Sequence, residues 1–257
     1  MPQHTTEEAL ARAITAIGSA NFVPRALDYL RTVTSFEGCF LTLLDGNRPP
    51  LHLYDNVRDE FRSHVIDYYL DGVYLLDPFF VIYRRDAPDG VFGLREVAPD
   101  RFAQSTYCRT YYSSIRLKDE VAVMIGLPTG KHLFYSIGRR SGEHKFSVRD
   151  MRRLRNLFPV FAAMNRRHFA QESYATPEGE IDTAMKRFGA GELTDREREI
   201  AILVLNGHSS RSIAEVIGVT PGTVKIHRKN FYRKLGISTQ SELFATFLAS
   251  LTDHAAN

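Results

Sequence analysis

The chain has 257 residues, of which 44% are hydrophobic and 25% charged, and its formal net charge is +3. This length favours two domains, at least one of them with a sizeable core. The net charge is too small to indicate nucleic-acid binding by itself, so any basic surface must be local.

The first residues, MPQHTTEEALARAI, carry Glu7 and Glu8 where a signal peptide has a basic start followed by an apolar run. We therefore expect no export signal, and no apolar stretch approaches membrane-spanning length. Cys39 and Cys108 lie far apart without metal-type spacing, which suits a reducing compartment. These features predict a cytoplasmic protein that makes no membrane contact.

Helices and one hairpin are expected in the first seventy residues. Apolar positions at helical spacing predict a helix over 7–17, and Pro24 suits the first turn of a second helix that runs to about Val33. The runs GCFLTLL and LHLY, parted by the turn DGN, predict a hairpin. Residues 57–70 follow as a third helix.

Helices and a second hairpin are expected in the next hundred residues. Asp77 and Pro78 resemble an N-cap and first helical residue, so a helix should run through FFVIYRR and end before Asp86. Another helix is expected over 100–113, and EVAVMIGLP with HLFYSIGR predicts a second hairpin. Ser147 should cap a long helix to about residue 171, whose apolar side comprises Leu154, Leu157, Phe158, Phe161 and Met164.

The expected fold class is α+β, with an N-terminal α/β/α sandwich around an antiparallel sheet over residues 1–172. Residues 173–190, rich in small and polar side chains with a Pro-Glu-Gly turn, predict a linker. Residues 191–257 form an all-α domain of four helices. There, Thr194 and Glu197 predict a capping box, and Gly207 should end the first helix.

A helix-turn-helix is expected within this C-terminal domain. Ser209 or Ser210 should cap the second helix and Gly218 should end it. Thr220 and Pro221 then start a basic third helix after a very short connection. On this helix Val224, His227 or Arg228, Phe231 and Leu235 should face inward. Lys225, Ile226 and Lys229 should face outward, where a helix in a major groove shows its base-reading side chains.

The C-terminal residues resemble the LuxR-type helix-turn-helix of bacterial transcription regulators. The resemblance rests on the motif LTxRExE, GxS, IA, TVKxH and KLG, in register over about sixty residues. The matching positions are Leu193, Thr194, Arg196, Glu197, Glu199, Gly207, Ser209, Ile213, Ala214, Thr223, Val224, Lys225, His227, Lys234, Leu235 and Gly236. Ser212 departs from the pattern, because the family usually has a Glu there that serves helix packing.

This resemblance implies a homodimer that binds operator DNA. It places Lys225, Ile226 and Lys229 at base edges and Thr223 and Arg228 at phosphates, while Arg233 would also contact the DNA backbone. RNA polymerase is a further partner that such regulators imply. A fourth helix over about 239–250 is similar to the family's dimerisation helix, although Leu243 and Phe247 could equally belong to the core of one chain, together with Leu248.

Regulators of this type carry a second domain, and its kind stays open from the residues alone. The hairpins contradict a phosphorylated receiver domain, whereas the long helix over 147–171 could serve a domain that only dimerises. The stretch YLDGVYLLDPFF is similar to the autoinducer-binding domain of LuxR-type quorum sensors, in which a Tyr precedes an Asp-Pro pair by nine positions. Tyr68, Asp77 and Pro78 match that spacing.

In that family the Tyr and Asp bind the amide region of an acyl-homoserine lactone, and two tryptophans enclose it. This chain has no Trp. His64 and Phe92 stand near the tryptophan positions, and Lys118–Glu120 near a family glycine, so we expect a ligand other than a lactone. Tyr74, Phe80 and Glu120 complete the expected ligand site. Carboxylates among aromatic rings would suit a cationic or amine-bearing ligand.

The N-terminal half as a whole resembles the autoinducer-binding-like or GAF-like sensor domain of solo LuxR-type regulators. We therefore expect a DNA-binding transcriptional regulator that senses a small molecule. The alternatives are a ligand-independent regulator whose N-terminal domain only dimerises or docks a protein, and a lactone receptor. Cys108 has no placed His or Asp to make it a nucleophile, so we expect neither an enzyme nor a cofactor nor a metal site.

Overall fold

The computed structural model describes residues 5–46, 48–86, 88–140, 142–171, 188–189 and 191–252. These residues belong to two compact units. The first unit comprises Met1–Arg58, Ile82–Glu96 and Leu117–Glu178, and the second comprises Asp59–Val81, Val97–Arg116 and Gly179–Asn257. The predicted linker over 173–190 lies almost entirely outside the described residues, so the predicted domain boundaries stay a prediction.

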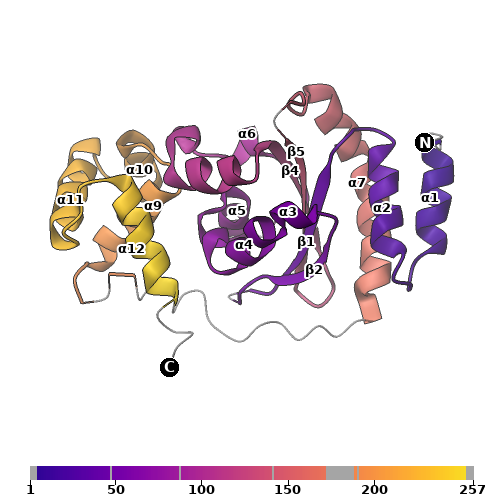
Figure 1. Ribbon diagram of the computed structural model, residues 1–257, viewed down its shortest axis with the longest axis horizontal. Coiled ribbons are helices and arrows are strands. Elements are labelled where there is room, and N and C mark those ends of the chain that lie inside the picture. The colour runs from indigo at the N-terminus through magenta and orange to yellow at the C-terminus, as the bar shows by residue number, and fades with distance from the viewer. Residues whose placement is uncertain are drawn as a thin grey trace. The chain divides into compact units, whose positions relative to one another are not determined.

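The first unit is built on an antiparallel sheet of five strands in the order β2-β1-β5-β4-β3 (Figure 1). The expected hairpins are confirmed, because β1 pairs with β2 and β4 pairs with β5. Strand β3, which has four residues and pairs with β4, was not predicted. The strand bounds are Gly38–Leu44 for β1, Leu51–Asp55 for β2, Gly90–Gly93 for β3, Leu117–Gly126 for β4 and His132–Arg140 for β5.

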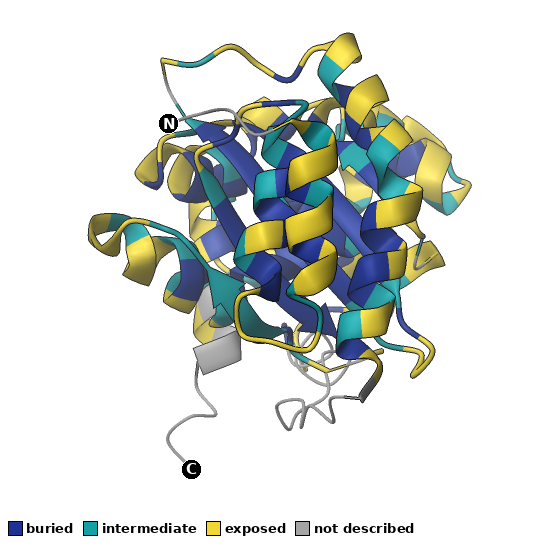
Figure 2. Cartoon of the chain, turned by 90° about the vertical axis from the view of Figure 1, so that its right-hand side faces the viewer, coloured by how far each residue is buried: buried dark blue, intermediate teal, exposed yellow. Residues whose placement is uncertain are grey.

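Helices α2 (Phe22–Arg31) and α7 (Val148–His168) cover one face of this sheet, and α1 (Thr6–Thr15) packs on the outer side of α2 (Figure 1). The outward sides of these helices are exposed and their inward sides are buried (Figure 2). Ser147 caps α7 through the amide of Asp150, as expected, and a short turn η5 (Phe169–Gln171) follows. Leu154, Phe161 and Met164 are buried in the core, with Leu157 and Phe158 packed against it, so the predicted apolar side is confirmed.

The second face of the sheet is also buried, but it is more polar. Thr42 on β1 is fully buried, and its hydroxyl has no hydrogen-bond partner among the described residues. Glu120 on β4 is buried as well and accepts a hydrogen bond from Ser136 of β5. A buried polar group costs free energy unless it is satisfied. Under the helices, by contrast, the buried polar pair is satisfied, because the Tyr135 hydroxyl donates to the Asn165 side chain of α7.

In the second unit, two regions predicted as regular helices contain wider, π-helical turns. The first runs through α3 (Asp59–Arg62), the π-turn η1 (Ser63–Asp67) and α4 (Tyr68–Leu70). The second contains η3 (Phe102–Gln104) and the π-turn η4 (Cys108–Tyr112). Such turns are rare and often lie at functional sites. The elements that join these regions to the sheet are η2 (Val73–Leu76), α5 (Pro78–Asp86) and α6 (Leu94–Val97).

The rest of the second unit is the expected C-terminal helical domain. Its helices are α9 (Asp195–Leu205), α10 (Ser210–Ile217), α11 (Pro221–Lys234) and α12 (Gln240–Thr252). Their bounds agree with the predicted ones within two residues. In the described part of the chain, no helix is long and apolar enough to span a membrane, and no group of side chains is arranged to hold a metal ion.

Candidate functional site

The capping box at the start of α9 ties two motif residues together. Thr194 accepts a hydrogen bond from the Glu197 amide, and the Glu197 carboxylate accepts one from the Thr194 amide, as predicted. The Lys234 ammonium, from the end of α11, lies 2.6 Å from the same carboxylate. Burial alone would raise the pKa of Glu197, but the hydrogen bonds from Lys234 and Thr194 lower it below its usual value. These residues therefore hold the helices together.

The connection between α10 and α11 has the expected helix-turn-helix form. Ser209 caps α10, and Gly218 ends it in a left-handed conformation with φ of 69°, which glycine adopts without strain. The Thr220 side chain accepts a hydrogen bond from the Thr223 amide, and Pro221 is the first residue of α11. The start of α11 is therefore determined locally.

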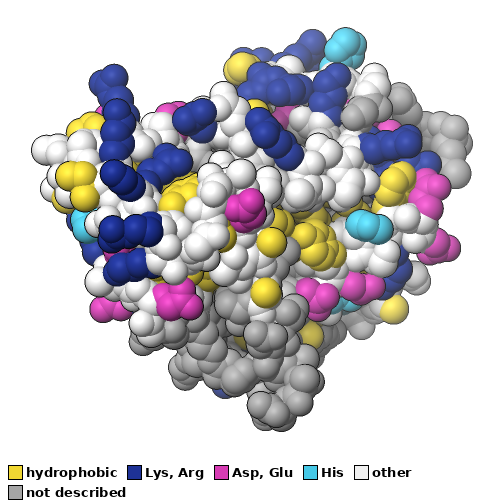
Figure 3. All heavy atoms as spheres, turned by 60° about the vertical axis from the view of Figure 1, so that its left-hand side comes forward, with side chains coloured by type: hydrophobic (Ala, Val, Ile, Leu, Met, Phe, Trp, Pro, Cys, Tyr) yellow, Lys and Arg dark blue, Asp and Glu magenta, His cyan; other side chains and the backbone are white. Residues whose placement is uncertain are grey.

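The two sides of α11 differ as predicted. Val224 and Phe231 are fully buried. Lys225 and Lys229 are exposed, and Ile226 has 63% of its surface accessible. An isoleucine this exposed between two lysines gains nothing from core packing, so this side of the helix is free to contact another molecule. Lys and Arg side chains gather along one edge of the face drawn in Figure 3, so positive charge is locally concentrated.

The remaining predicted DNA-contacting residues lie in different surroundings. Arg233 is exposed on the last turn of α11. Thr223 is half-buried, with its hydroxyl 2.9 Å from that of Thr220. Arg228 is also half-buried, and its guanidinium donates to the Ser210 hydroxyl at 3.3 Å. Arg228 thus points toward α10 in this DNA-free structure, and its expected contact with a DNA phosphate stays a prediction.

Ser212, the departure from the family pattern, has a partner in this chain. Its hydroxyl lies 2.8 Å from His208 Nδ1. Burial lowers the pKa of His208, although the charge of Asp100 opposes that effect. Ser212 of α10 therefore contacts His208, which precedes that helix, at the position where the family pattern has a Glu.

The side chains of α12 that could have served dimerisation are buried within one chain. Leu243 and Phe247 are fully buried, and the Phe247 ring packs edge-on against Phe188 with 5.4 Å between centroids. They are therefore intrachain core, which decides between the two interpretations that the sequence left open. The side chain of Leu248 lies outside the described residues.

A second group of residues in the same unit forms a tyrosine cluster. Its members come from the two regions with π-helical turns and from the segment between them: Tyr69, Tyr74, Tyr107, Tyr111 and Tyr112. All five are buried, and adjacent ring centroids lie 5.5 to 6.1 Å apart. The Tyr111 hydroxyl donates to the Val65 carbonyl at 2.9 Å and so joins the two π-turns.

Asp77 contacts this cluster, and both of its carboxylate oxygens accept hydrogen bonds. The Tyr69 hydroxyl donates to Oδ2 at 2.7 Å, and the Phe79 amide donates to Oδ1 at 2.8 Å, as expected for an N-cap. Burial raises the pKa of Asp77 to about 6, although those hydrogen bonds oppose the shift. Asp77 thus serves as the cap of α5 and as an acceptor for Tyr69, and the expected cationic ligand stays a prediction.

Tyr107 is the member of the cluster whose polar group has no partner. Its side chain is 1% exposed, and its hydroxyl makes no hydrogen bond within the described part of the chain. The ring stacks on Tyr111, and Phe102 and Tyr112 meet it edge-on. Leaving a buried hydroxyl unpaired costs about 1 to 3 kcal/mol, so an unpaired group of this kind calls for an explanation such as an absent ligand or water.

The other predicted ligand residues are only partly brought to this cluster. Tyr68 is half-buried, 6.4 Å from the Tyr111 ring, and Phe80 meets Tyr74 edge-on at 5.0 Å. His64 is exposed on η1, beside the Ser63 hydroxyl. Phe92 on β3 and Glu120 on β4 belong to the first unit. The unpaired hydroxyl of Tyr107 had no signal in the sequence, because it depends on which rings pack around it.

Comparison with known proteins agrees with this arrangement of helices. Residues 191–247 match the model for bacterial regulatory proteins of the luxR family. Over 186 residues the chain is 31% identical to a putative HTH-type transcriptional regulator of Aeromonas salmonicida, and the match covers 68% of this chain and 94% of that protein. The chain belongs to the LuxR family of transcriptional regulators. The family assignment predicted from the helix-turn-helix motif is thus confirmed.

Two further proteins match separate parts of this regulator. It is 40% identical over 70 residues to UhpA of Escherichia coli, a match covering 27% of this chain and 35% of that protein. It also shares its fold with the LBD domain of VqsR from Pseudomonas aeruginosa, with a TM-score of 0.57 and 23% identity over 65% of this chain and 98% of that one. The N-terminal region thus resembles ligand-binding domains in fold.

Proposed function

We propose that this regulator binds duplex operator DNA as a homodimer and reads base edges with Lys225, Ile226 and Lys229 of α11. The observation that supports this is the division of α11 into a buried side, which packs on α9 and α10, and a basic outer side. A helix held in this way can enter the major groove while its outer side chains reach the bases. Arg233, exposed one turn further on, would contact the DNA backbone.

The test is a binding measurement on a duplex that the full-length protein selects from a random pool. Lys225→Ala and Lys229→Ala should each weaken specific binding by about 1 to 3 kcal/mol and relax the sequence preference. Lys145→Ala removes an equally exposed lysine on the first unit and serves as the control. If both α11 variants bind this duplex as tightly as Lys145→Ala at the same salt concentration, the assignment of the reading side is wrong.

We further propose that the N-terminal region senses a small molecule other than an acyl-homoserine lactone, and that this molecule controls promoter binding. The unpaired, buried hydroxyl of Tyr107 supports a ligand, because a carbonyl or hydroxyl oxygen of that ligand would satisfy it. The chain has no Trp to enclose a lactone as the resemblance would require.

To test this, the protein is purified from its native host and any co-purifying molecule is identified by mass spectrometry. Tyr107→Phe should lose that molecule, because the variant keeps the ring but not the donor. Tyr54→Phe, which removes a hydroxyl from the first unit, should retain it. A molecule kept equally by both variants would exclude Tyr107 as the contact.

The two rival functions give different results in the same experiment. A domain that only dimerises or docks a protein predicts that no small molecule co-purifies and that no metabolite raises the melting temperature. A lactone receptor predicts that N-octanoyl homoserine lactone raises the melting temperature of the wild-type protein. Either result would overturn the proposed ligand class.

A further inference from the structure

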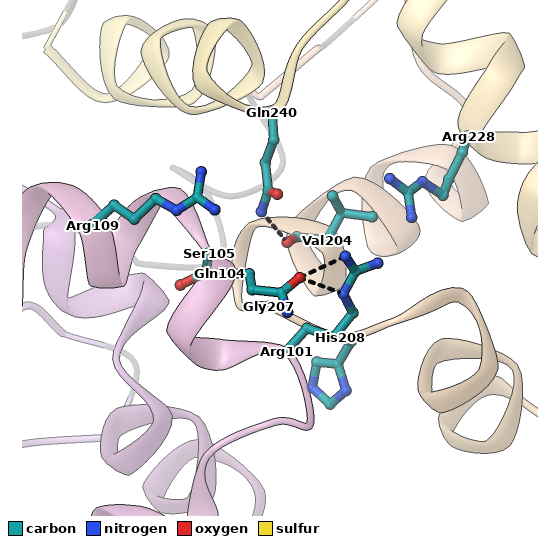
Figure 4. A pocket seen from close by; sticks show the side chains of 9 residues that line it. All are labelled: Arg101, Gln104, Ser105, Arg109, Val204, Gly207, His208, Arg228 and Gln240. Carbon is teal, nitrogen blue, oxygen red and sulfur yellow. Dashed lines mark hydrogen bonds between the residues drawn. The ribbon is translucent and has the colours of Figure 1, made fainter.

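A polar pocket within the second unit lies beside the helix-turn-helix, apart from the tyrosine cluster and the outer side of α11. Its volume is about 220 Å³. Nine residues line it: Arg101, Gln104, Ser105, Arg109, Val204, Gly207, His208, Arg228 and Gln240. They come from η3 and the segment after it, from the end of α9 and the turn that follows, and from α11 and α12 (Figure 4).

Direct contacts hold the walls of this pocket together. The Arg101 amide donates to the Gly207 carbonyl at 3.1 Å, and the Ser209 amide donates to Asp100 Oδ1 at 3.1 Å. Gly207 has φ of 97°, and a Cβ there would lie 2.9 Å from the Phe102 Cα. Only glycine permits this approach without strain. The segment around Phe102 is thus closely packed on the turn between α9 and α10.

The pocket concentrates positive charge. Three of its nine lining residues are arginines, and none of the nine is Asp or Glu. Arg109 and Arg228 extend toward the hollow from opposite sides in Figure 4. Arg101 donates to the Gln104 side chain at 2.6 and 3.0 Å, and Arg228 makes its long hydrogen bond to Ser210. Arg109 is exposed; its amide donates to the Ser105 carbonyl at 3.1 Å, but no hydrogen bond or ion pair is found for its guanidinium group among the described residues.

Ser105 and Gln240 also line this hollow with neutral polar side chains. The Ser105 hydroxyl already donates to the Phe102 carbonyl at 2.7 Å, and the Gln240 amide already donates to the Val204 carbonyl at 2.8 Å. Burial lowers the pKa of the His208 ring, which disfavours its charged form, and the arginines supply the positive charge of the lining. Guanidinium groups are the side chains best suited to bind phosphate oxygens in pairs.

We propose that this pocket binds a small phosphate-bearing anion, either free phosphate or a phosphomonoester. The anion would connect Arg101 and Arg109, which precede and follow Ser105, with Arg228 of α11. A bound anion would also keep Arg228 directed toward the pocket and away from the DNA backbone. This last consequence rests on the proposed DNA binding, whereas anion binding itself does not.

The first experiment is calorimetric titration of the full-length protein, without DNA, with inorganic phosphate at constant ionic strength. One phosphate should bind per chain, and Arg109→Gln should weaken binding about tenfold or more, as expected for a lost charge-assisted hydrogen bond. Arg149→Gln is the matched control, because Arg149 is exposed on α7 with no partner among the described residues. No binding at millimolar phosphate, or equal loss in both variants, overturns the proposal.

Two further arms separate the sources of the phosphate and the effect on DNA. Phenyl phosphate that binds more tightly than inorganic phosphate identifies the site as one for a phosphomonoester, and the reverse order identifies free phosphate. Phosphate should weaken DNA binding by the wild-type protein more than by Arg109→Gln. If phosphate binds but leaves DNA affinity unchanged, the proposed competition between phosphate and DNA for Arg228 is wrong, but the anion site is still supported. If the protein does not bind DNA at all, only this competition experiment fails, because the calorimetric titration uses no DNA.

Discussion

Helix α11 and the tyrosine cluster lie in the same compact unit and use their side chains in opposite ways. On α11 most polar side chains point outward and the apolar side chains Val224 and Phe231 are buried. The candidate DNA-binding surface is therefore the side of the helix that does not pack in the core. In the tyrosine cluster the polar groups are themselves buried, and their hydrogen bonds decide which of them can bind anything. An outward surface can be recognised by periodicity, whereas a buried polar cluster depends on every neighbour.

The largest change in stability is expected on the buried side of α11. Phe231→Ala removes a fully buried ring and should lower the free energy of unfolding by about 3 to 5 kcal/mol. Ile226→Ala, on the exposed side, should change it by less than about 0.5 kcal/mol. Urea denaturation of the full-length proteins checks both. Similar losses in the two variants would contradict the division of the helix into a buried and an outer side.

The next effect concerns Asp77 and depends on pH. Burial raises its pKa to about 6 in the folded protein, above the 3.8 of an exposed Asp, so the folded state binds this proton more tightly. The resulting stabilisation is fully present below pH 4 and is lost as pH rises through about 6. It amounts to roughly 3 kcal/mol across that range. Comparing the stability of wild type and Asp77→Asn from pH 4 to 7 should show this slope in the wild type alone.

Two tyrosine hydroxyls in the cluster should respond differently to removal. Tyr69→Phe takes away the donor to Asp77 and should cost about 1 to 2 kcal/mol of stability, since the acceptor is buried and charged in part. Tyr107→Phe removes a hydroxyl with no partner, so ligand-free protein should be equally stable or more stable. Melting temperatures of the ligand-free variants test this, and a large loss in Tyr107→Phe would mean that its hydroxyl is satisfied.

The smallest effect lies between α9 and α11. Lys234→Met keeps the apolar part of the side chain but removes the charge that pairs with buried Glu197. Because the Lys234 side chain is 33% exposed, solvent screens the pair, and we expect a loss of only about 1 kcal/mol in unfolding free energy. Specific DNA affinity should otherwise stay unchanged. A loss of DNA binding without loss of stability would instead make Lys234 a DNA contact.

The sequence by itself determined those features that depend on neighbouring residues along the chain. The caps at Ser147, Thr194 and Thr220 and the buried positions of α11 were all predictable, because capping and helical periodicity are local. The hairpins followed from apolar runs around short turns. The four-residue strand β3 was missed, because so short a segment becomes a strand through its pairing with β4.

Only the tertiary structure decided where the polar groups end up. It assigned Leu243 and Phe247 to the core of one chain, turned Arg228 toward Ser210, and gave Ser212 a partner in His208. It also showed that both carboxylate oxygens of Asp77 accept hydrogen bonds, whereas the Tyr107 hydroxyl has no partner among the residues that the structure describes. Each of these outcomes depends on segments distant in sequence that pack together, and the cost of an unpaired buried group is set by that packing.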